Sequence, residues 1–413
     1  MKTTKLFWVA VLGLAAFGLG ACSTILDVEF PGTIPVEQID DPALAPVLAR
    51  SVMSDFECAY SNYAIVSASQ SDEYETSNQN VPLANWGERS ITANENAYVI
   101  GTCDALGIHL TLHTARFQSE DIFNRISAWT DAQVTGRASL MSQVKAYGGY
   151  AYELMGETFC EVSFDAGPAQ PRAAALTLAE QRFSDAITLA QQGNNTDMLN
   201  LARVGRARSR LMQTKFAEAA ADAQLIAAGY VRNGDRGAEA TRRWNDVFYY
   251  ANTLGAYTVA FDLRTIVDPR LQVANTGRPA FIPTIPLWAT NKYAALTSPI
   301  RLASYREAQL ILAESLAEQN QIPQALTILN TRRAELGLTP LTATTKDEAI
   351  TAVLGERRME LAFEGGHRLA DLLRKSLPWK GANGSTVNAN PITGRPYGTT
   401  TCWPHPTREV AGA

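Results

Sequence analysis

The stretch DMLNLARVGRARSRLMQTKFAEAAADAQLIA, residues 197–227, indicates the fold of this chain most clearly. It contains two amphipathic runs of helical spacing, separated by a polar break at Gln213-Thr214-Lys215. Ala207 and Ala219 lie twelve positions apart, and Phe216 precedes the second alanine by three. Two antiparallel helices need small residues where their backbones come closest and a larger apolar side chain beside them. The stretch therefore predicts a closely packed helix pair.

The same arrangement recurs farther along the chain. Ala313 and Ala325 are again twelve positions apart, with Ile322 three positions before the second alanine. A unit repeated in this way cannot bury its apolar face alone and stacks on its neighbours. The repeat resembles a tetratricopeptide unit.

A third, degenerate copy lies before the first. Its first helix is expected around 146–155, with Gly148 and Gly149 at the close-approach positions, and its second helix passes through Phe183. The connection at 159–171 is too long for a tight turn. An insertion is therefore expected between these two helices.

A fourth helical element follows Thr345. Thr345 and Glu348 form a capping-box pattern, and Leu354 and Leu361 lie seven positions apart on one face of the expected helix. The stretch 368–374 continues with helical spacing. We expect a mainly α fold in which tetratricopeptide-like pairs form a short solenoid, with pairs near 139–190, 197–228, 302–336 and 346–375.

Two regions, 60–102 and 229–300, do not follow the helical pattern. They hold most of the large aromatic residues with polar tips, among Ser, Asn, Gly and Pro. Aromatic side chains in irregular segments on a rigid helical frame are typical of a binding surface. We expect these two regions to form a ligand-binding subdomain.

The start of the chain is typical of an exported protein. The apolar stretch 6–17 follows two lysines and leads to Leu19-Gly20-Ala21-Cys22. This stretch is too short to span a bilayer and predicts a signal peptide over 1–21. Leu-Gly-Ala-Cys resembles the bacterial lipobox, which predicts acylation of Cys22, with palmitate as the expected chain. Several acyl chains on one cysteine anchor a protein durably to a membrane.

The residues after Cys22 indicate the compartment and the domain boundary. Ser23 follows the cysteine, and the absence of Asp at that position favours the outer membrane. Several prolines between 22 and 48 predict a tether, and residues 49–413 form the folded domain. Four further cysteines in an oxidising compartment predict two disulfides or, as the alternative, buried free thiols. The sequence leaves the pairing open among three connectivities, with the first two cysteines forming the shorter loop: Cys58, Cys103, Cys160 and Cys402.

Composition and motifs argue against other classes of function. Lys and Arg number 36 against 41 Asp and Glu, a net charge of −5, which leaves no basic face for nucleic acid. His109 and His113 lie four apart but lack a third metal ligand, so a structural role is expected. The carboxylate pairs Asp72-Glu73 and Glu120-Asp121 are expected to be solvated or to cap helices. We therefore expect neither catalysis nor a cofactor or metal.

The segment ERRMELAFEGGHRLADL, residues 356–372, is similar to the signature E-R-R-x-E-L-x-x-E-G-x-R-x-x-D-L of the SusD/RagB family, with one extra glycine before His367. Further similarities lie at 26–28, 268–270 and 305–314. Opposite charges at helical spacing more often tie helices together than perform acid–base chemistry. We therefore expect a structural role for its charged members: Glu356, Arg357, Arg358, Glu360, Glu364, Arg368 and Asp371.

The resemblance implies a nutrient-binding outer-membrane lipoprotein that passes glycans to a SusC-like TonB-dependent transporter. It also implies that the tetratricopeptide-like side contacts the transporter and that the irregular aromatic regions hold the ligand. A sugar offers an apolar C–H face and a rim of hydroxyls, which suit aromatic rings flanked by polar groups. The candidate ligand residues are Tyr74, Asn85, Trp86, Trp288 and Tyr293.

Three other functions are weighed for the same sequence, one of which, a hydrolase with cryptic carboxylates, predicts turnover of a glycan. A tetratricopeptide scaffold lipoprotein of envelope assembly would bind proteins, and a related uptake protein would bind peptide or another nutrient instead of glycan. Aromatic side chains that form a ligand surface should be exposed together, whereas a scaffold would bury or scatter them.

Overall fold

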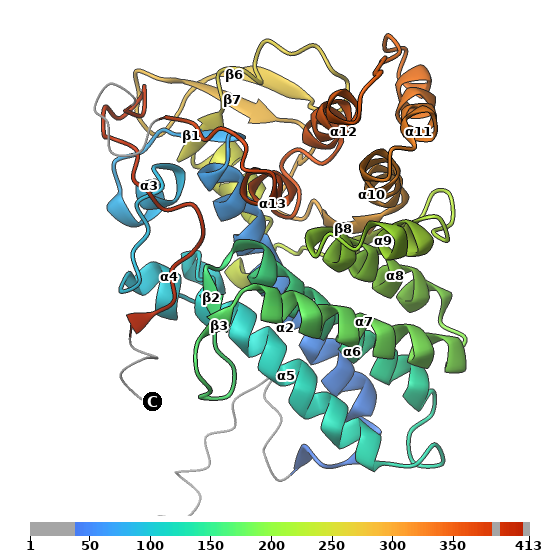
Figure 1. Cartoon of the computed structure of the whole chain (residues 1–413). Coiled ribbons are helices and arrows are strands. Elements are labelled where there is room, and N and C mark those ends of the chain that lie inside the picture. Colours follow the sequence, from blue (N-terminus) through green and yellow to red (C-terminus); the bar gives the residue numbers. More distant parts are fainter. Residues whose placement is uncertain (1–37, 382–388, 408–413) are drawn as a thin grey trace, which may run out of the picture. The chain divides into compact units, whose positions relative to one another are not determined.

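The computed structural model describes residues 38–381 and 389–407 (Figure 1). The expected signal peptide, Cys22 and most of the expected tether lie outside the described residues. The chain divides into two units, Met1–Leu44 and Ala45–Ala413. The described part of the first unit contains one short 3-10 turn, η2 (Pro42–Leu44).

The second unit is built mainly of helices. Short helical turns and strands occupy the connections between them. The α-helices are α2 (Ala45–Gln70), α3 (Val81–Gly87), α4 (Asn96–Ile100), α5 (His109–Ala128), α6 (Arg137–Thr158), α7 (Ala173–Gln192), α8 (Thr196–Met212), α9 (Phe216–Ala223), α10 (Tyr305–Glu318), α11 (Ile322–Glu335), α12 (Lys346–Glu360) and α13 (His367–Arg374).

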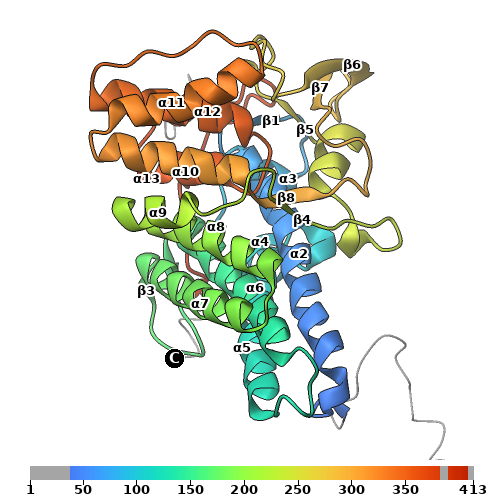
Figure 2. The same ribbon diagram turned by 90° about the vertical axis from the view of Figure 1, so that its right-hand side faces the viewer.

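Helices that follow one another in the sequence pack side by side. α5 packs on α6, α6 on α7, α7 on α8 and α8 on α9, and the series continues through α10, α11 and α12. Figure 2 shows these helices stacked on one side of α2, with the strands and long loops of residues 231–300 on the other. The expectation of a mainly helical fold with stacked helix pairs is confirmed.

Close approach between helices explains the small residues of the repeats. The break expected at 213–215 separates α8 from α9. A Cβ atom on Gly149 of α6 would lie 2.7 Å from the ring of Phe183 on α7, and one on Gly205 of α8 would lie even closer to the same ring. The Phe183 side chain therefore fills the space between three helices because both glycines leave room for it.

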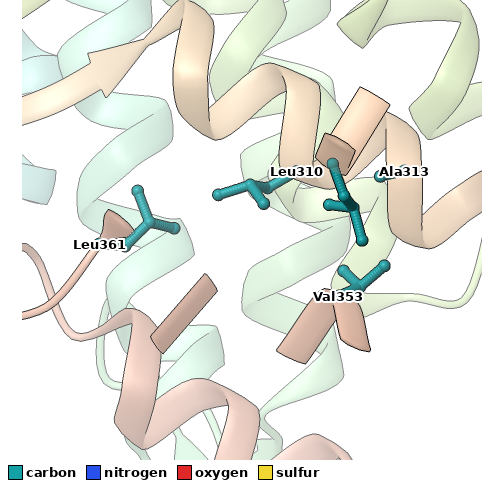
Figure 3. Close-up of a cluster of buried hydrophobic side chains, with 5 residues drawn as sticks. Leu310, Ala313, Val353 and Leu361 are labelled. Carbon is teal, nitrogen blue, oxygen red and sulfur yellow. The ribbon is translucent and has the colours of Figure 1, made fainter. Parts of the chain in front are cut away.

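The last helix pairs share a small apolar core, shown in Figure 3. Thr345 caps α12 with the expected capping box, in which the side chains of Thr345 and Glu348 each accept a backbone N–H bond. The core cluster joins α10, α11 and α12 and extends to the residue after α12: Leu310, Ala313, Leu329, Val353 and Leu361.

The expectation that residues 60–102 are irregular is wrong for residues 60–70. Helix α2 continues without a break to Gln70, and its first residues lie within the tether expected over 22–48. Every residue from Phe56 to Gln70 is buried. A helix buried all round shows no amphipathic period, so residues 60–70 carry no helical signal in their spacing.

Short antiparallel strand pairs fasten the irregular regions. β1 (Tyr74–Thr76) pairs with β5 (Tyr257–Val259), and β4 (Val231–Gly234) pairs with β8 (Ile300–Ser304). The other two pairs are β2 (Glu161–Val162) with β3 (Gln170–Pro171), which form the insertion expected between α6 and α7, and β6 (Val273–Pro279) with β7 (Pro286–Thr290).

Two disulfides tie remote segments to the helical core. Cys58 of α2 is bonded to Cys103, with a Cα–Cα distance of 5.6 Å, and Cys160 is bonded to Cys402, with a Cα–Cα distance of 5.0 Å. Of the three connectivities open from the sequence, the structure has the one with the short first loop. The second disulfide holds the C-terminal segment beside the end of α6, where Trp403 is fully buried.

The charged signature segment is a network of ion pairs. Arg357 bonds to Asp371 at 2.9 Å and joins α12 to α13, while Glu356 accepts from Arg270 at 2.6 Å. The remaining charged members pair with side chains of other segments: Arg358 with Asp262, Glu360 with Arg332, Glu364 with Lys292 and Arg368 with Asp72.

The extra glycine of the signature has a steric reason. Gly365 and Gly366 both have positive φ angles, +45° and +76°, which favour glycine. A Cβ atom on either would collide with a tyrosine of α2, Tyr60 or Tyr63. Two glycines in sequence therefore let the turn before α13 lie against the central helix.

Candidate ligand-binding surface

Two of the residues expected to bind ligand lie in the core. Tyr74 and Trp86 are fully buried. Trp86 packs edge-on against Tyr98 and Trp403, and Tyr74 packs on Phe363. A ring enclosed in this way has no face for a sugar, so the expectation for these two residues is corrected.

The other three expected residues do not form one site either. Tyr293 is 4% exposed, and its hydroxyl donates to the carbonyl of Phe363 at 2.9 Å, which is a core position. Asn85 is half-buried and donates to the carboxylate of Glu95. Trp288 is also half-buried, and the guanidinium of Arg264 lies over its ring. Of the five, only Trp288 keeps an aromatic ring near the surface.

The half-buried aromatic side chains that do gather together are Trp244, Tyr249 and Tyr250, called the aromatic trio below. The ring centroids of Trp244 and Tyr249 are 5.0 Å apart, and those of Tyr249 and Tyr250 are 4.9 Å apart. Trp244 directly follows the 3-10 turn η4 (Thr241–Arg243), and Tyr249 and Tyr250 lie in the π-helical turn η5 (Phe248–Thr253). Adjacent, partly exposed rings of this kind offer apolar faces with polar tips to a ligand.

Buried asparagines hold the trio in place. Asn245 accepts the N–H of Phe248 and donates to the carbonyl of Ser298, which starts the helical turn and fixes it to the following loop. Asn252 donates to the carbonyls of Thr290 and Tyr293 at the other end of the turn. The side chain of each asparagine bonds to backbone groups that would pair with other backbone groups in a regular helix or sheet. The trio therefore stands on a rigid support.

Helix α2 also holds the trio in place. The Ser61 hydroxyl of α2 donates to the carbonyl of Trp244 at 2.9 Å and accepts the N–H of Asp246 at 3.0 Å. Ser61 is fully buried, so these bonds are shielded from water. The trio is thus bonded directly to α2.

Two aspartates lie beside the trio. Asp104 is exposed and accepts a hydrogen bond from the hydroxyl of Thr241. Burial raises the pKa of Asp246 to about 7, against the lowering effect of Ser61 and Arg236. Burial, followed by the charge of Asp246, raises the pKa of Tyr250, so its phenol remains a hydrogen-bond donor. Donors and acceptors therefore adjoin the aromatic faces.

A pocket of about 230 Å³ opens next to Asp104. The disulfide between Cys58 and Cys103 lies in its wall, and helix α5 contributes an exposed side chain, Leu110. This cavity is called the disulfide pocket below. Its lining residues are Asp55, Cys58, Thr102, Cys103, Asp104, Leu110, Thr111, Thr114 and Arg242.

A larger polar cavity of about 460 Å³ lies against the signature segment. Glu360 and Glu364 face it, and Lys292, Arg301 and Arg332 reach into it. Lys292 bonds to Glu364 at 3.2 Å, and Arg332 bonds to Glu360 at 2.9 Å. Its charges are therefore matched within the protein, and its walls belong to the network that joins α12 to the loops.

The residues considered for chemistry have structural partners. Asp72 pairs with Arg368, and Glu73 is buried and accepts the N–H of Phe363. The rings of His109 and His113 lie 4.4 Å apart among aromatic side chains, and burial lowers the pKa of His113. Within the described ranges, no three His, Cys, Asp or Glu side chains are grouped to hold a metal ion.

The comparisons with known proteins agree with this architecture. The model of the SusD family matches residues 289–411, which include the signature segment. Residues 289–411, about a third of the chain, thus match the SusD family. The predicted resemblance to the SusD/RagB family is confirmed for this part of the chain. No curated protein matches the chain.

Solved structures share most of the fold. A SusD-like carbohydrate binding protein from Bacteroides vulgatus ATCC 8482 has 17% identity and a TM-score of 0.64, covering 81% of this chain and 83% of its own. A SusD-like carbohydrate binding protein from Bacteroides fragilis NCTC 9343 has 14% identity and a TM-score of 0.64, covering 91% and 99%. Surface glycan-binding protein A from Bacteroides uniformis has 14% identity and a TM-score of 0.62, covering 88% and 97%. At these identities the similarity shows the fold.

Across the part of the chain that the structure describes, no helix is both long and apolar enough to cross a membrane.

Proposed function

We propose that this protein is a cell-surface lipoprotein that captures glycans on the aromatic trio. The observation that carries the proposal is the gathering of Trp244, Tyr249 and Tyr250, partly exposed and rigidly supported, on the irregular side of a SusD-family fold. A pyranose ring stacks its C–H face on an aromatic ring, and its hydroxyls bond to neighbouring carboxylates and phenols. Asp104 and the Tyr250 hydroxyl would make those bonds.

Structural relatives support glycan as the ligand class. Two of those compared above are described as carbohydrate binding proteins and a third as a surface glycan-binding protein. The aromatic trio gives this chain a surface of matching chemistry. The larger charged cavity is a weaker candidate because its cations already pair with its carboxylates.

The proposal includes an anchor and a delivery partner. Acylation of Cys22 would hold the protein on the outer membrane, and the stacked helices would contact a SusC-like TonB-dependent transporter. The trio lies across α2 from those helices, so capture and transporter docking would use different surfaces. Copurification from the native outer membrane in mild detergent should recover an equimolar TonB-dependent barrel. Recovery of envelope-assembly proteins instead would favour the scaffold function.

Glycan capture is tested by substitution in the trio. Screening the full-length protein on arrayed glycans identifies a binder, and calorimetry then measures its affinity. Tyr249→Ala should weaken binding by about tenfold or more, because a stacking ring at the centre of the trio is lost. Phe117→Ala, at an exposed phenylalanine on α5, is the matched control and should bind as the wild type does.

Trp288→Ala in the same assay tests the remaining sequence-based candidate. Loss of binding in Trp288→Ala but not in Tyr249→Ala would move the site away from the trio. Binding of peptides but of no arrayed glycan would replace the glycan with another nutrient.

A further inference from the structure

The disulfide pocket adjoins the aromatic trio through shared residues. Asp104 lines the pocket and accepts the Thr241 hydroxyl from the turn that leads into Trp244. Arg242 lines the pocket two residues before Trp244. A ligand stacked on the trio would therefore meet the mouth of this pocket.

The size of the pocket limits what enters it. Its volume of about 230 Å³ is several times the ~30 Å³ that one water molecule occupies in the liquid. It is smaller than the ~300–1,000 Å³ of sites that enclose a whole drug-sized ligand. One ring of a longer chain fits this range better than a complete oligosaccharide does.

The walls of the pocket combine an apolar face with hydrogen-bonding groups. Leu110, 43% exposed, and the disulfide form apolar surface. Asp55 uses one oxygen to accept from Arg242 at 3.0 Å, and Asp104 uses one to accept from Thr241. A carboxylate has two oxygens and about four acceptor sites, so both aspartates keep capacity for hydroxyl donors.

The charge of the lining selects among sugars. The lining residues carry two carboxylates, Asp55 and Asp104, against one guanidinium, Arg242. Arg242 already pairs with Asp55 at 3.0 Å, so the lining keeps one net negative charge, which repels the carboxylate of a sugar acid even where water screens it. Neutral and basic sugars meet no such penalty.

We infer that the disulfide pocket is a second subsite of the glycan site, which takes one neutral or amino sugar ring and rejects acidic sugars. The inference rests on the proposed capture of glycans by the aromatic trio. The trio, with three rings, stacks on the first sugars of the chain, and the pocket holds a ring farther along the chain, beyond the reach of a disaccharide, by hydrogen bonds. Longer chains and branches are therefore bound more tightly than short ones.

Filling the pocket tests the subsite. Titration uses the disaccharide and pentasaccharide of neutral gluco-, manno- and xylo-oligosaccharides with the full-length protein. Leu110→Trp should lower the affinity for the pentasaccharide by about tenfold and leave that for the disaccharide unchanged. Thr114→Tyr fills the same pocket from an exposed position and should do the same. Phe117→Trp, two turns beyond Leu110 along α5 and outside the pocket lining, is the control.

The charge selection has its own test. Wild-type protein should bind oligogalacturonates more weakly than neutral chains of equal length. Asp55→Asn should reduce that difference severalfold, because it removes one of the two negative charges of the lining. An unchanged difference would overturn the charge argument.

The outcomes separate the two proposals. Wild-type pentasaccharide affinity in both filled variants, with a loss in Tyr249→Ala, overturns the subsite and leaves capture by the trio intact. Equal losses for disaccharide and pentasaccharide also overturn it, because the pocket would then not be a separate subsite. No loss in Tyr249→Ala, or no binding of any oligosaccharide, removes the proposed function and the subsite with it.

Discussion

The stacked helices and the irregular aromatic regions relate to the sequence in opposite ways. In the helices, contacting residues lie close in sequence or at a fixed repeat, as Ala313 of α10 and Leu329 of α11 do. In the irregular regions, contacts join remote segments: Trp86 packs on Trp403, and Tyr74 packs on Phe363. Spacing therefore predicts burial in the first region and says nothing about it in the second.

The difference is clearest for tryptophan. Trp86 and Trp244 both lie in segments rich in aromatic and polar residues, yet one is fully buried and the other is half-exposed. Local sequence offers the same signal for both. Only the segments that fold over Trp86, among them the C-terminal one, make it a core residue.

The largest expected effect comes from replacing each of the two tryptophans by alanine. Trp86→Ala should lower the free energy of unfolding by about 3–5 kcal/mol, because a large cavity is left among packed rings. Trp244→Ala should change stability little and weaken glycan binding. Urea denaturation and calorimetry measure the two quantities. A free energy of unfolding in Trp86→Ala equal to that of the wild type would contradict the core role of Trp86 and make it a candidate ligand residue again.

The disulfide beside the site connects the two regions, so its removal should affect both stability and binding. Replacing Cys58 and Cys103 by Ala opens a loop with a sequence separation of 45 and should cost about 2–4 kcal/mol. Glycan affinity should fall as well, because Asp104 is no longer fixed to α2. Replacing Cys160 and Cys402 is the matched control: it should lower stability and leave affinity unchanged. Equal glycan affinity in the two double variants would show that the Cys58–Cys103 disulfide does not support the glycan site.

Buried Asp246 gives the irregular region a pH dependence. Its pKa is raised from 3.8 to about 7, so the folded state holds a proton that the unfolded state has released. Its contribution to stability is full below about pH 4 and is lost as pH rises to about 7. Asp246→Asn should therefore make the free energy of unfolding less dependent on pH between about 4 and 7. Urea denaturation at several pH values measures this dependence.

Asp131→Asn is the control for that profile, because the Asp131 side chain is 83% exposed. It should leave the slope between about pH 4 and 7 as in the wild type. If the free energy of unfolding falls with pH equally steeply in the wild type and in Asp246→Asn, Asp246 is not the group that causes the pH dependence.

The smallest expected effect lies in the helical region. Thr345→Ala removes the capping bond to the N–H of Glu348 and should cost about 1 kcal/mol. Thr327→Ala, at an exposed position within α11, should be neutral or slightly stabilising because Ala is the better helix former. Thermal denaturation resolves the two. Glycan affinity should not change in either variant, since neither residue is near the trio's supports.

The candidate site could be predicted only as a region. The stretch 229–300 was expected to bind ligand and contains the aromatic trio, but the individual residues expected there and in 60–102 were mostly core residues. Three polar-tipped aromatics within seven positions, next to Asn245, were the one local signal for the trio. Its rigidity depends on Ser61 of α2 and on the carbonyl of Ser298, which no local pattern reveals.

The sequence by itself determined the helix pairs, the capping box at Thr345, the break at 213–215 and the family signature. These follow from interactions between residues a few positions apart, which any chain with that spacing makes. The tertiary structure decided which aromatics are exposed, which cysteines pair and why Gly365 and Gly366 must both be glycine. Those outcomes depend on contacts between segments that lie 45 to more than 300 positions apart in the chain, where burial is set by the whole fold rather than by local sequence.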